Sequence, residues 1–281
     1  MMKKANRRVI PGFGLSMGVT LTLLSVVVII PLASLAIFAA NMSFGDVIET
    51  ITRKRVLASF EVSFITALIA SLINAVMGVI LAWVLVRYDF PLKRLLDGMI
   101  ELPFALPTAV AGISLTSLTA DKGLIGGFFA KFGVKIAYTR IGITVAMVFI
   151  GIPFVVRAVQ PVLEKLDSSY EEAAAVLGAS RRRTFWKVIF PEIMPAVFTG
   201  FGLAFGRCLG EYGSVVFIAG NQPFETEITP LIIMSELQEY DYASASAIAL
   251  VMLAASFLIL FLVNLIQIRN SKILKGGGSG A

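Results

Sequence analysis

The sequence predicts an all-α membrane protein with six transmembrane helices, and two features of its composition support this class. Of its 281 residues, 57% are hydrophobic and 15% are charged, and the mean hydropathy is +0.88. Soluble domains hold about 25% charged residues, so this chain is depleted in charge. The apolar residues also gather into runs of roughly the 20 residues that cross a bilayer as a helix.

Six apolar runs are long enough to span a bilayer. They are Phe13–Ala40, Leu57–Val86, Met99–Leu118, Ile141–Val162, Pro195–Ile218 and Ser244–Ile268. The first run has 28 residues and is longer than the apolar core of a signal peptide, so we expect it to remain as the first span. Residues 13–268 are then expected to form a single membrane domain.

The third run is the least regular. Pro103 and Pro107 interrupt its start, Thr108 follows, and Ser114 adds a hydroxyl further along. Broken or polar backbone is tolerated at membrane depth where it is buried in protein or lines a wet cavity. These four residues are therefore candidates for lining a path through the bundle, and a kinked structural helix explains them equally well.

The basic residues predict the orientation. With the N-terminus inside, fifteen lysines and arginines fall on the cytoplasmic side and seven on the other side. The positive-inside rule therefore favours cytoplasmic termini, with residues 1–12 and 269–275 as tails. Residues 276–281, GGGSGA, resemble a linker left by protein expression. The loop Asn221–Tyr242 would lie outside, where its five acids and lack of basic residues suit docking of a soluble partner.

Residue usage argues against chemistry in this chain. Cys208 is the only cysteine and there is no histidine, which removes the commonest general base and metal ligand. No G-x-x-x-x-G-K-[ST] phosphate loop and no nucleophile–base set are visible. We therefore expect no catalytic site, no metal site and no cofactor in this chain. The basic residues lie at the ends of apolar runs, which suits a membrane better than nucleic acid.

A charged segment, residues 164–192, separates the fourth and fifth runs and contains SSYEEAAAVLGASRRRTFWKVIFPE. Ser168 with Glu171, and Ser169 with Glu172, each fit the S-x-x-E capping box of a helix start. Alanines and a leucine favour the helix that follows. Gly178 can end this helix, because a left-handed residue costs glycine little.

A second helix should follow the glycine. Ser180 can cap it, and it would run through Phe185 toward Pro191, outside the bilayer like the first helix. Resting on the membrane surface, this helix could use Arg181–Arg183 for lipid headgroups and Phe185 and Trp186 as interfacial anchors. That interpretation explains the second helix, but it does not explain why the first is rich in small residues and closely capped.

The segment resembles the EAA loop of bacterial ABC importer permeases. The resemblance rests on Glu172-Ala173-Ala174, three residues, Gly178, nine residues, and then Val188-Ile189-Phe190-Pro191. The family pattern ends Ile-x-Leu-Pro, so Val188 and Phe190 are conservative departures. The resemblance implies a coupling helix that fits a cleft in a cytoplasmic ATPase. The residues it assigns to coupling are Glu172, Ala173, Ala174, Gly178, Arg181, Phe185 and Pro191.

Three further stretches narrow the resemblance. ELPFALPTAVAGISL (Glu101–Leu115), GRCLGEYGSVVFIAGN (Gly206–Asn221) and LQEYDYASASAIA (Leu237–Ala249) are similar to sulfate/thiosulfate importer permeases of the T type. The resemblance extends from about Val9 to Gln267. Molybdate permeases, and with them tungstate importers, share the EAA loop and the LGE-aromatic-G segment, so they remain the near alternative.

The resemblance implies a subunit in the bacterial inner membrane, surrounded by lipid, that carries sulfate or thiosulfate. Its implied partners are a homologous second permease, two copies of an ATPase that binds ATP and Mg²⁺, and an extracytoplasmic sulfate-binding protein. Two other classes are weighed against it. A secondary carrier would bind its substrate between internal repeats, and no convincing repeat is visible. A non-transporting scaffold would need neither a broken third span nor charges inside the membrane.

Two polar features inside the spans are expected to hold helices together. Asn74 lies near the middle of the second span and is more often interhelical glue than a substrate contact. Gly202, Gly206 and Gly210 recur every four residues and would let another helix approach closely, within the chain or in a partner. Arg157 in the fourth span is expected to snorkel toward the cytoplasmic edge.

Arg207 and Glu211 are four residues apart in the fifth span, so a helix would bring them together as an ion pair. Unpaired charges at mid-membrane are costly, which predicts that the pair lies inside the bundle. A structural role in neutralising the charges is favoured over a role for Arg207 in attracting an anion along the path, because a paired arginine has little net field.

Overall fold

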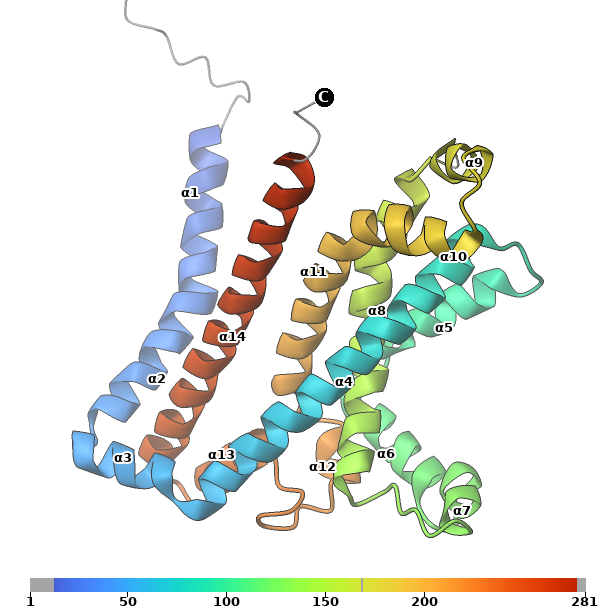
Figure 1. The fold of residues 1–281 in the computed structure, drawn as a ribbon. Helices are drawn as coiled ribbons and strands as arrows, with labels where there is room; N and C mark the ends of the chain where they lie inside the picture. The colour runs from blue at the N-terminus through green and yellow to red at the C-terminus, as the bar shows by residue number, and fades with distance from the viewer. Residues whose placement is uncertain (1–12, 168, 277–281) are drawn as a thin grey trace, which may run out of the picture.

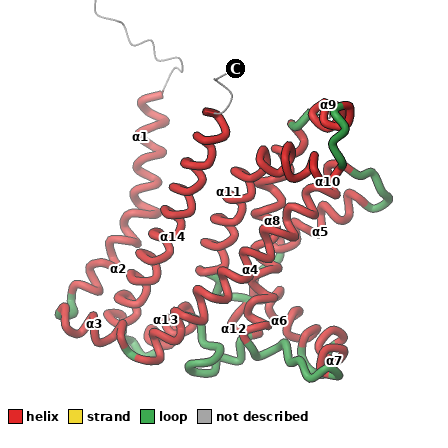
Figure 2. The backbone as a smooth tube through the Cα atoms, viewed as in Figure 1, coloured by secondary structure: helices red, strands yellow, loops and turns green. Residues whose placement is uncertain are grey.

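The computed structural model describes residues 13–167 and 169–276, and all regular elements in this part of the chain are helices (Figure 2). The first half holds α1 (Phe13–Leu24), the π-helical turn η1 (Ser25–Ile29), α2 (Ile30–Ala40), α3 (Phe44–Thr52), α4 (Lys54–Arg87), α5 (Lys93–Ala105), α6 (Thr108–Thr119) and α7 (Leu124–Ala130). The second half holds α8 (Arg140–Lys165), α9 (Ser169–Val176), α10 (Arg181–Thr184), the π-helical turn η2 (Phe185–Ile189), α11 (Phe190–Leu209), α12 (Val215–Ile218), α13 (Thr229–Gln238) and α14 (Tyr242–Gly276). The tail 1–12 and Ser168 lie outside the described residues.

Five helical segments are long and apolar enough to cross a membrane. They are Phe13–Ala40, Lys54–Arg87, Arg140–Lys165, Arg181–Leu209 and Tyr242–Leu265. The bent pair of Lys93–Ala105 and Thr108–Ala130 makes a sixth when it is counted as one span. In Figure 1, α1 begins and α14 ends on the side of α9, whereas α3, α7 and α13 lie on the opposite side. The prediction that both ends of the domain share one side with the EAA segment is confirmed.

The third predicted span, Met99–Leu118, is interrupted near its start, as its prolines predicted. It corresponds to a bent pair of helical segments, Lys93–Ala105 and Thr108–Ala130, which differ in direction by 115°. The break falls at Leu106, which is extended at φ −86° and ψ 136° and directly precedes Pro107. A residue before proline is pushed out of the α region, so the helix ends there. Pro103, in contrast, is accommodated inside α5.

The fifth predicted span, Pro195–Ile218, has both ends misplaced. α11 ends at Leu209, and a non-helical stretch separates it from the short α12. Toward the N-terminus, α10, η2 and α11 run on without a break from Arg181. The second helix of the EAA segment is therefore continuous with this span and is not a separate helix. The π turn ends two residues before Pro191, which lacks the amide donor of a regular helix.

The last helix is longer than predicted, since α14 continues through residues 269–275 to Gly276 instead of ending at Ile268. Links that the sequence pattern suggested were loops contain the helices α3, α7 and α13. The first of these has a capping box, in which Ser43 Oγ accepts from the amide of Asp46 and the Asp46 carboxylate accepts from the amide of Ser43.

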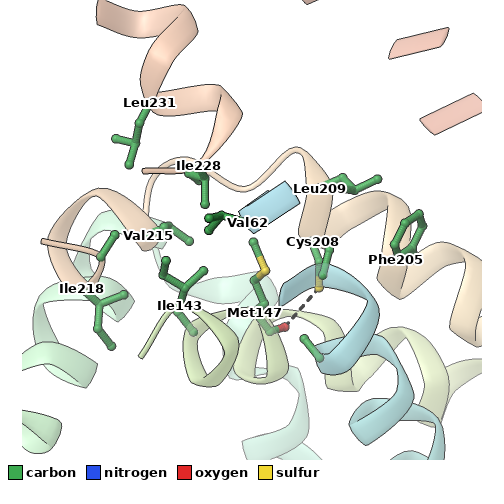
Figure 3. Packing of buried hydrophobic residues seen from close by; sticks show 14 of the residues in the cluster. Val62, Ile143, Met147, Phe205, Cys208, Leu209, Val215, Ile218, Ile228 and Leu231 are labelled. Atoms are coloured by element: carbon green, nitrogen blue, oxygen red, sulfur yellow. Dashed lines mark hydrogen bonds between the residues drawn. The ribbon is translucent and has the colours of Figure 1, made fainter. Parts of the chain in front are cut away.

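The core lies where α4, α8 and α11 pack together. Figure 3 shows its central cluster, which includes Val62, Ile143, Met147, Phe205 and Cys208, all at most 2% exposed. The thiol of Cys208 donates to the carbonyl oxygen of Met147 at 3.3 Å and so links α11 to α8. In contrast, α1 and α2 contain no buried residue, and α2 packs beside α14, apart from this core (Figure 1).

Close approach of α8 and α11 depends on Gly200. A Cβ at this position would lie 2.7 Å from the Cα of Val155 and 3.2 Å from the Cβ of Ala158. The first neighbour is backbone and cannot move aside without shifting the helix. We therefore expect Gly200→Ala to lower the free energy of unfolding by about 1–3 kcal/mol, the usual cost of overpacking.

Gly98→Ala is the matched control, because Gly98 is also inside a helix but no atom lies within 4 Å of the place that a Cβ would take. It should be neutral or stabilise by up to about 1 kcal/mol through helix propensity. Thermal unfolding of the two purified variants checks the pair. Equal stability of both variants would contradict the packing argument.

Candidate functional site

The EAA segment begins with α9, an isolated helix with defined ends. Asp167 Oδ1 accepts from the amide of Ser169 at 2.9 Å at its start. Ser169 is already the first helical residue, so the predicted capping box of Ser169 with Glu172 does not describe this start. The alternative box begins at Ser168, which lies outside the described residues.

The predicted stop at Gly178 is confirmed. Its φ is +78°, in the left-handed region. The amide of Gly178 donates to the carbonyl of Ala175 and the amide of Ala179 donates to that of Ala174, each at 2.9 Å. This pair of bonds is a Schellman motif, which satisfies the last carbonyls of the helix. The chain therefore leaves α9 in a fixed direction.

An ion pair ties α9 to the transmembrane domain. Arg87, the last residue of α4, places Nη2 2.8 Å from Glu171 Oε1. The same nitrogen lies 3.4 Å from the carbonyl oxygen of Leu166, and the guanidinium lies 5.7 Å from the ring centre of Trp83. The sequence did not predict this contact. Its only sequence signal is a cation at the end of an apolar run, next in space to a helix rich in acids.

The outer surface of α9 is not covered by its own chain. The helix has no buried residue. Val176 is 87% exposed, Leu177 is 86% exposed and Tyr170 is 57% exposed. Short helices are marginal in water and depend on tertiary packing for stability. A small exposed helix held by one ion pair and a capped end therefore has the properties of a surface for another protein.

The second half of the segment packs onto α4. Ser180 caps α10 as predicted, since its hydroxyl accepts from the amide of Arg183 at 3.4 Å. Phe185 meets Trp83 edge to face, with ring centres 5.4 Å apart. A groove of about 480 Å³ runs between the two halves. It brings together three residues that the sequence assigned to coupling, namely Glu172, Arg181 and Phe185.

The other coupling candidates keep their places along the segment. Ala173 and Ala174 lie on α9, and Pro191 lies near the start of α11. Because α10, η2 and α11 are continuous, Arg181 and Pro191 belong to the same helical run as the intramembrane residue Arg207. The second half of the EAA segment and the fifth span are therefore joined by continuous helix.

The predicted ion pair of Arg207 and Glu211 is confirmed, with Arg207 Nη1 2.6 Å from Glu211 Oε2. Its predicted setting on one helix is wrong, because α11 ends at Leu209. Glu211 is 1% exposed, and its Oε1 accepts from the amide of Ser214 at 2.7 Å and from the Ser214 hydroxyl at 2.9 Å. The carboxylate therefore fixes the non-helical turn that ends the span.

Arg207 is only partly enclosed, with 34% of its side chain exposed. It lies in a groove of about 630 Å³ between α11 and α14, together with Gly202, Gly206, Leu260 and Asn264. A Cβ at Gly206 would lie 3.4 Å from Leu260, so these glycines face the last helix of the same chain. Gly210 lies beyond the end of α11 and does not continue the stripe.

The remaining path candidates do not converge. Thr108 lies against Gly213, two residues beyond Glu211, because the start of α6 packs on the turn after α11. Ser114 and Pro107 are exposed, and Pro103 is partly exposed within α5. Asn74 is buried beside Gly151 of α8, and its amide atoms have no hydrogen-bond partner among the described residues.

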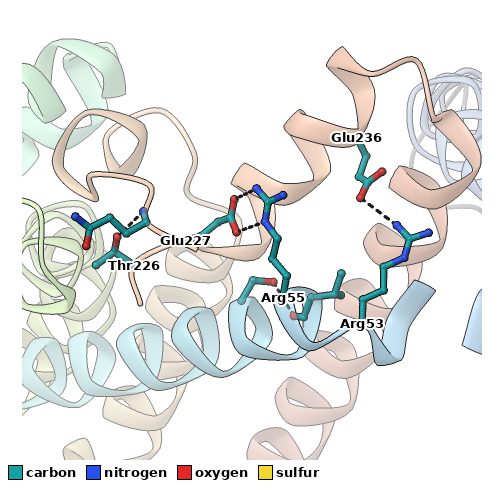
Figure 4. A network of polar contacts seen from close by, with 8 residues as sticks. Arg53, Arg55, Thr226, Glu227 and Glu236 are labelled. Atoms are coloured by element: carbon teal, nitrogen blue, oxygen red, sulfur yellow. Dashed lines mark hydrogen bonds and ion pairs between the residues drawn. The ribbon is translucent and has the colours of Figure 1, made fainter. Parts of the chain in front are cut away.

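The acidic loop is not the unpaired surface that the sequence predicted. Figure 4 shows Arg55 binding Glu227 with two contacts of 2.7 and 2.5 Å, and Arg53 lying 3.5 Å from Glu236. Glu227 is 2% exposed. The lack of basic residues within the loop is thus offset by arginines at the start of α4, which the loop's own composition could not reveal.

Two acids of this region titrate away from their ordinary values. Burial raises the pKa of Glu236, although Arg53 opposes the shift. The side chain and amide of Ser244 hold the pKa of Asp241 below its usual value by hydrogen bonding to the carboxylate. Asp241 accepts from that amide at 3.0 Å and precedes α14, so it caps this helix.

Arg157 has a more specific setting than snorkelling. Its Nη2 lies 2.8 Å from Asp97 Oδ1 and 2.7 Å from Glu101 Oε1, both on α5. Nη1 also donates to Gln160 Oε1 at 2.7 Å. The sequence signal was available, since two acids four residues apart share a helix face and can meet one cation. This cluster joins the first half of the broken span to α8.

Comparison with known proteins assigns the class of this fold. Residues 74–272 match the family described as binding-protein-dependent transport system inner membrane component. The chain belongs to this family.

Curated relatives match the chain over nearly its whole length. The chain is 50% identical over 276 residues to the sulfate transport system permease protein CysT of Escherichia coli (strain K12). The alignment covers 98% of this chain and 100% of the relative. The protein of the same name from Synechocystis sp. is 47% identical over 249 residues, covering 89% of this chain and 87% of the relative.

Solved structures agree on the fold. A bacterial ABC transporter involved in the import of the acidic polysaccharide alginate matches with a TM-score of 0.76 at 14% identity, covering 92% of this chain and 96% of that chain. The bacterial alginate ABC transporter in complex with an alginate pentasaccharide-bound periplasmic protein matches with a TM-score of 0.75 at 16% identity, covering 92% and 94%.

The buried ion pair after α11 can be tested by a double substitution. Arg207→Gln alone leaves the enclosed Glu211 carboxylate without its cation, and removing one partner of a buried pair costs about 3–5 kcal/mol. Arg207→Gln with Glu211→Gln should recover most of this loss, because an amide oxygen can still accept from Ser214. Thermal unfolding of the purified chain measures both variants.

Arg53→Gln provides the control, since its 3.5 Å pair with Glu236 is looser and 47% of the arginine side chain is exposed. We expect a loss below about 1 kcal/mol there. If Arg207→Gln is as mild as the control, the pair does not hold the turn.

Proposed function

We propose that the chain is the permease subunit of an ATP-driven importer that carries sulfate, and thiosulfate with it, across the bacterial cytoplasmic membrane. The observation that carries this proposal is α9, an exposed and rigidly capped helix in the EAA segment of a transport-family chain. The names of relatives at 47–50% identity support sulfate over the molybdate alternative. The chain would act as a conduit without catalysis of its own.

The proposed partners supply the parts of an importer that this chain does not provide. Two copies of an ATPase would bind ATP and Mg²⁺, and one of them would receive α9. A second, homologous permease would complete the path, and an extracytoplasmic sulfate-binding protein would deliver the anion to the outer side. The solved alginate transporter is in complex with a periplasmic protein that holds its pentasaccharide, which supports a delivery partner here.

Two contacts would transmit movement of α9 into the membrane. The pair of Arg87 and Glu171 leads to the end of α4, with 2.8 Å between the charged atoms. The continuous run from Arg181 leads down the fifth span to Arg207 and the turn at Glu211. Since interfaces between packed helices tend to switch between discrete arrangements, movement at one end of this run is expected to re-set the turn at the other.

Arg207 is the proposed anion contact, though its partner limits that role. Its charge is largely neutralised by Glu211 at 2.6 Å, while its exposed part borders the groove against α14. Sulfate uptake by the double Gln variant at positions 207 and 211 separates the roles. Uptake at the parental rate assigns the pair to structure, and an assembled but inactive complex assigns Arg207 to the path.

Coupling through α9 should depend on the left-handed Gly178. Gly178→Val forces a β-branched side chain into φ +78°, at a cost of about 1–2 kcal/mol. That cost lowers the ratio of the native to the alternative conformations at the end of α9 about 5- to 30-fold. We expect the variant to insert in the membrane but to lose ATPase binding and substrate-stimulated ATP hydrolysis in the reconstituted complex.

Gly133→Val is the matched control. Gly133 has φ +75° and, like Gly178, has nothing within 4 Å of its Cβ position. It follows α7, on the side of the molecule away from α9 (Figure 1). The control should retain coupling. Normal transport by Gly178→Val would remove α9 from the transmission route.

The orientation can be tested by cysteine labelling. In a Cys208→Ser background, Glu239→Cys should react with an impermeant reagent added outside intact spheroplasts. Val176→Cys on α9 should react only after lysis. Both positions are exposed, whereas the buried Glu227 would give no informative label. The reverse pattern would invert the proposed orientation and place α9 outside.

A further inference from the structure

A groove of about 340 Å³ separates α4 from the beginning of the α10–α11 run. One wall consists of Val79, Ile80 and Trp83 of α4, and the other carries Phe185 and Trp186 of η2. Ile80 is 49% exposed and Trp186 is 59% exposed, so the groove opens to the surroundings. Apart from its mouth, the groove is hydrocarbon and aromatic.

Two arginines lie at this groove, Arg181 and Arg182, and both are exposed. Neither forms an ion pair with a carboxylate in the part of the chain that the structure describes. Arg87 nearby differs, because it is engaged with Glu171. The groove therefore combines positive charge at its mouth with an apolar channel.

The depth of the apolar wall selects the occupant. Val79 lies eight residues before Arg87, the last residue of α4, which corresponds to about 12 Å along a helix axis. An apolar wall this far into a transmembrane helix lies in the region of acyl chains. A soluble protein could meet the arginines but would not extend along Val79 and Ile80. A phospholipid has both parts, a headgroup phosphate and a chain of suitable length.

We propose that this groove binds one anionic phospholipid, whose headgroup contacts Arg181 and Arg182 and whose acyl chain lies along Val79 and Ile80. Clusters of basic residues beside a span attract anionic lipid, and aromatic side chains at this level anchor in the interface. The lipid would brace the beginning of the fifth span against the second, next to the EAA segment. This assignment requires only that the chain spans a membrane, and it is independent of the substrate.

The chain supplies its own probe. It contains two tryptophans, Trp83 and Trp186, and both line this groove. The full chain is reconstituted in phosphatidylcholine vesicles that contain either brominated phosphatidylglycerol or the same fraction of brominated phosphatidylcholine. Bromine quenches tryptophan on contact. We expect stronger quenching by the anionic lipid, and equal quenching by the two lipids would overturn the proposal.

Matched substitutions separate a built site from general charge attraction. Arg182→Gln should reduce the preference for phosphatidylglycerol about fivefold, the factor for about 1 kcal/mol per basic residue near a membrane surface. Arg183→Gln removes the same charge one residue further on, outside the groove lining, and should change the preference little. Equal losses in both variants would reduce the effect to diffuse attraction and overturn the site.

A second pair of substitutions tests the apolar wall along which the acyl chain is proposed to lie. Ile80→Gln should lower quenching by phosphatidylglycerol, because it places an amide where the chain would lie. Ile73→Gln makes the same change at a position 40% exposed on α4 but outside the groove, and should have no effect. An inorganic anion or an acidic protein at the arginines would be indifferent to Ile80. Unchanged quenching in Ile80→Gln, with the arginine effect retained, would therefore show a contact of the arginines with charge alone, without an acyl chain in the groove, and would overturn the lipid site.

Discussion

The requirement that every backbone amide and carbonyl in hydrocarbon be satisfied within the protein determines this structure. Helices meet it by themselves, and the chain departs from helix at two places inside the bundle. One is the break at Leu106 and Pro107, and the other is the turn after α11. The two breaks lie close together, since a Cβ at Gly213 would meet Thr108, the first residue of α6. At the second break Glu211 and Ser214 are buried in protein, whereas Leu106 and Pro107 at the first break stay exposed.

Buried charged side chains, like the backbone, find their partners within the protein. The two most enclosed carboxylates, Glu211 and Glu227, are each held by an arginine and lie at ends of helices. In both cases the arginine is the more exposed partner, which keeps part of its hydration while it neutralises the acid. Such pairs add little net stability, but removal of either partner is costly. These pairs therefore fix where a membrane-spanning helix ends and how the connection that follows it folds back onto the bundle.

Hydropathy was sufficient to predict the class, the number of crossings and the side shared by both ends, because span length and the distribution of cations are properties of the sequence itself. Local rules also predicted the stop at Gly178 and the cap at Ser180. The ends of the fifth span were missed, since Val215–Ile218 is as apolar as the helix before it. Hydropathy does not register the turn that Glu211 creates by accepting from Ser214.

The contacts that give the candidate site its geometry join segments far apart in sequence, and no local pattern could predict them. Arg87 and Glu171 are typical, as are Arg55 and Glu227. For the second pair, the loop's acid count suggested a surface with free negative charge, whereas the folded chain supplies the cations from α4. Composition of one loop is therefore a weak guide to the field around it, and a docking surface must be argued from what remains exposed after folding.

On that criterion α9 and the acidic loop Asn221–Tyr242 differ. Two acids of the loop, Glu227 and Glu236, are paired with arginines of the same chain, so a partner there would rely on acids that remain exposed, such as Glu225 and Glu239. α9 is attached through Glu171, which pairs with Arg87, and leaves Val176 and Leu177 at its end exposed. Exposing two large apolar side chains beside a rigid glycine stop is unfavourable for an isolated chain. Covering them with a cleft in another protein, as proposed above for the ATPase, would remove this cost.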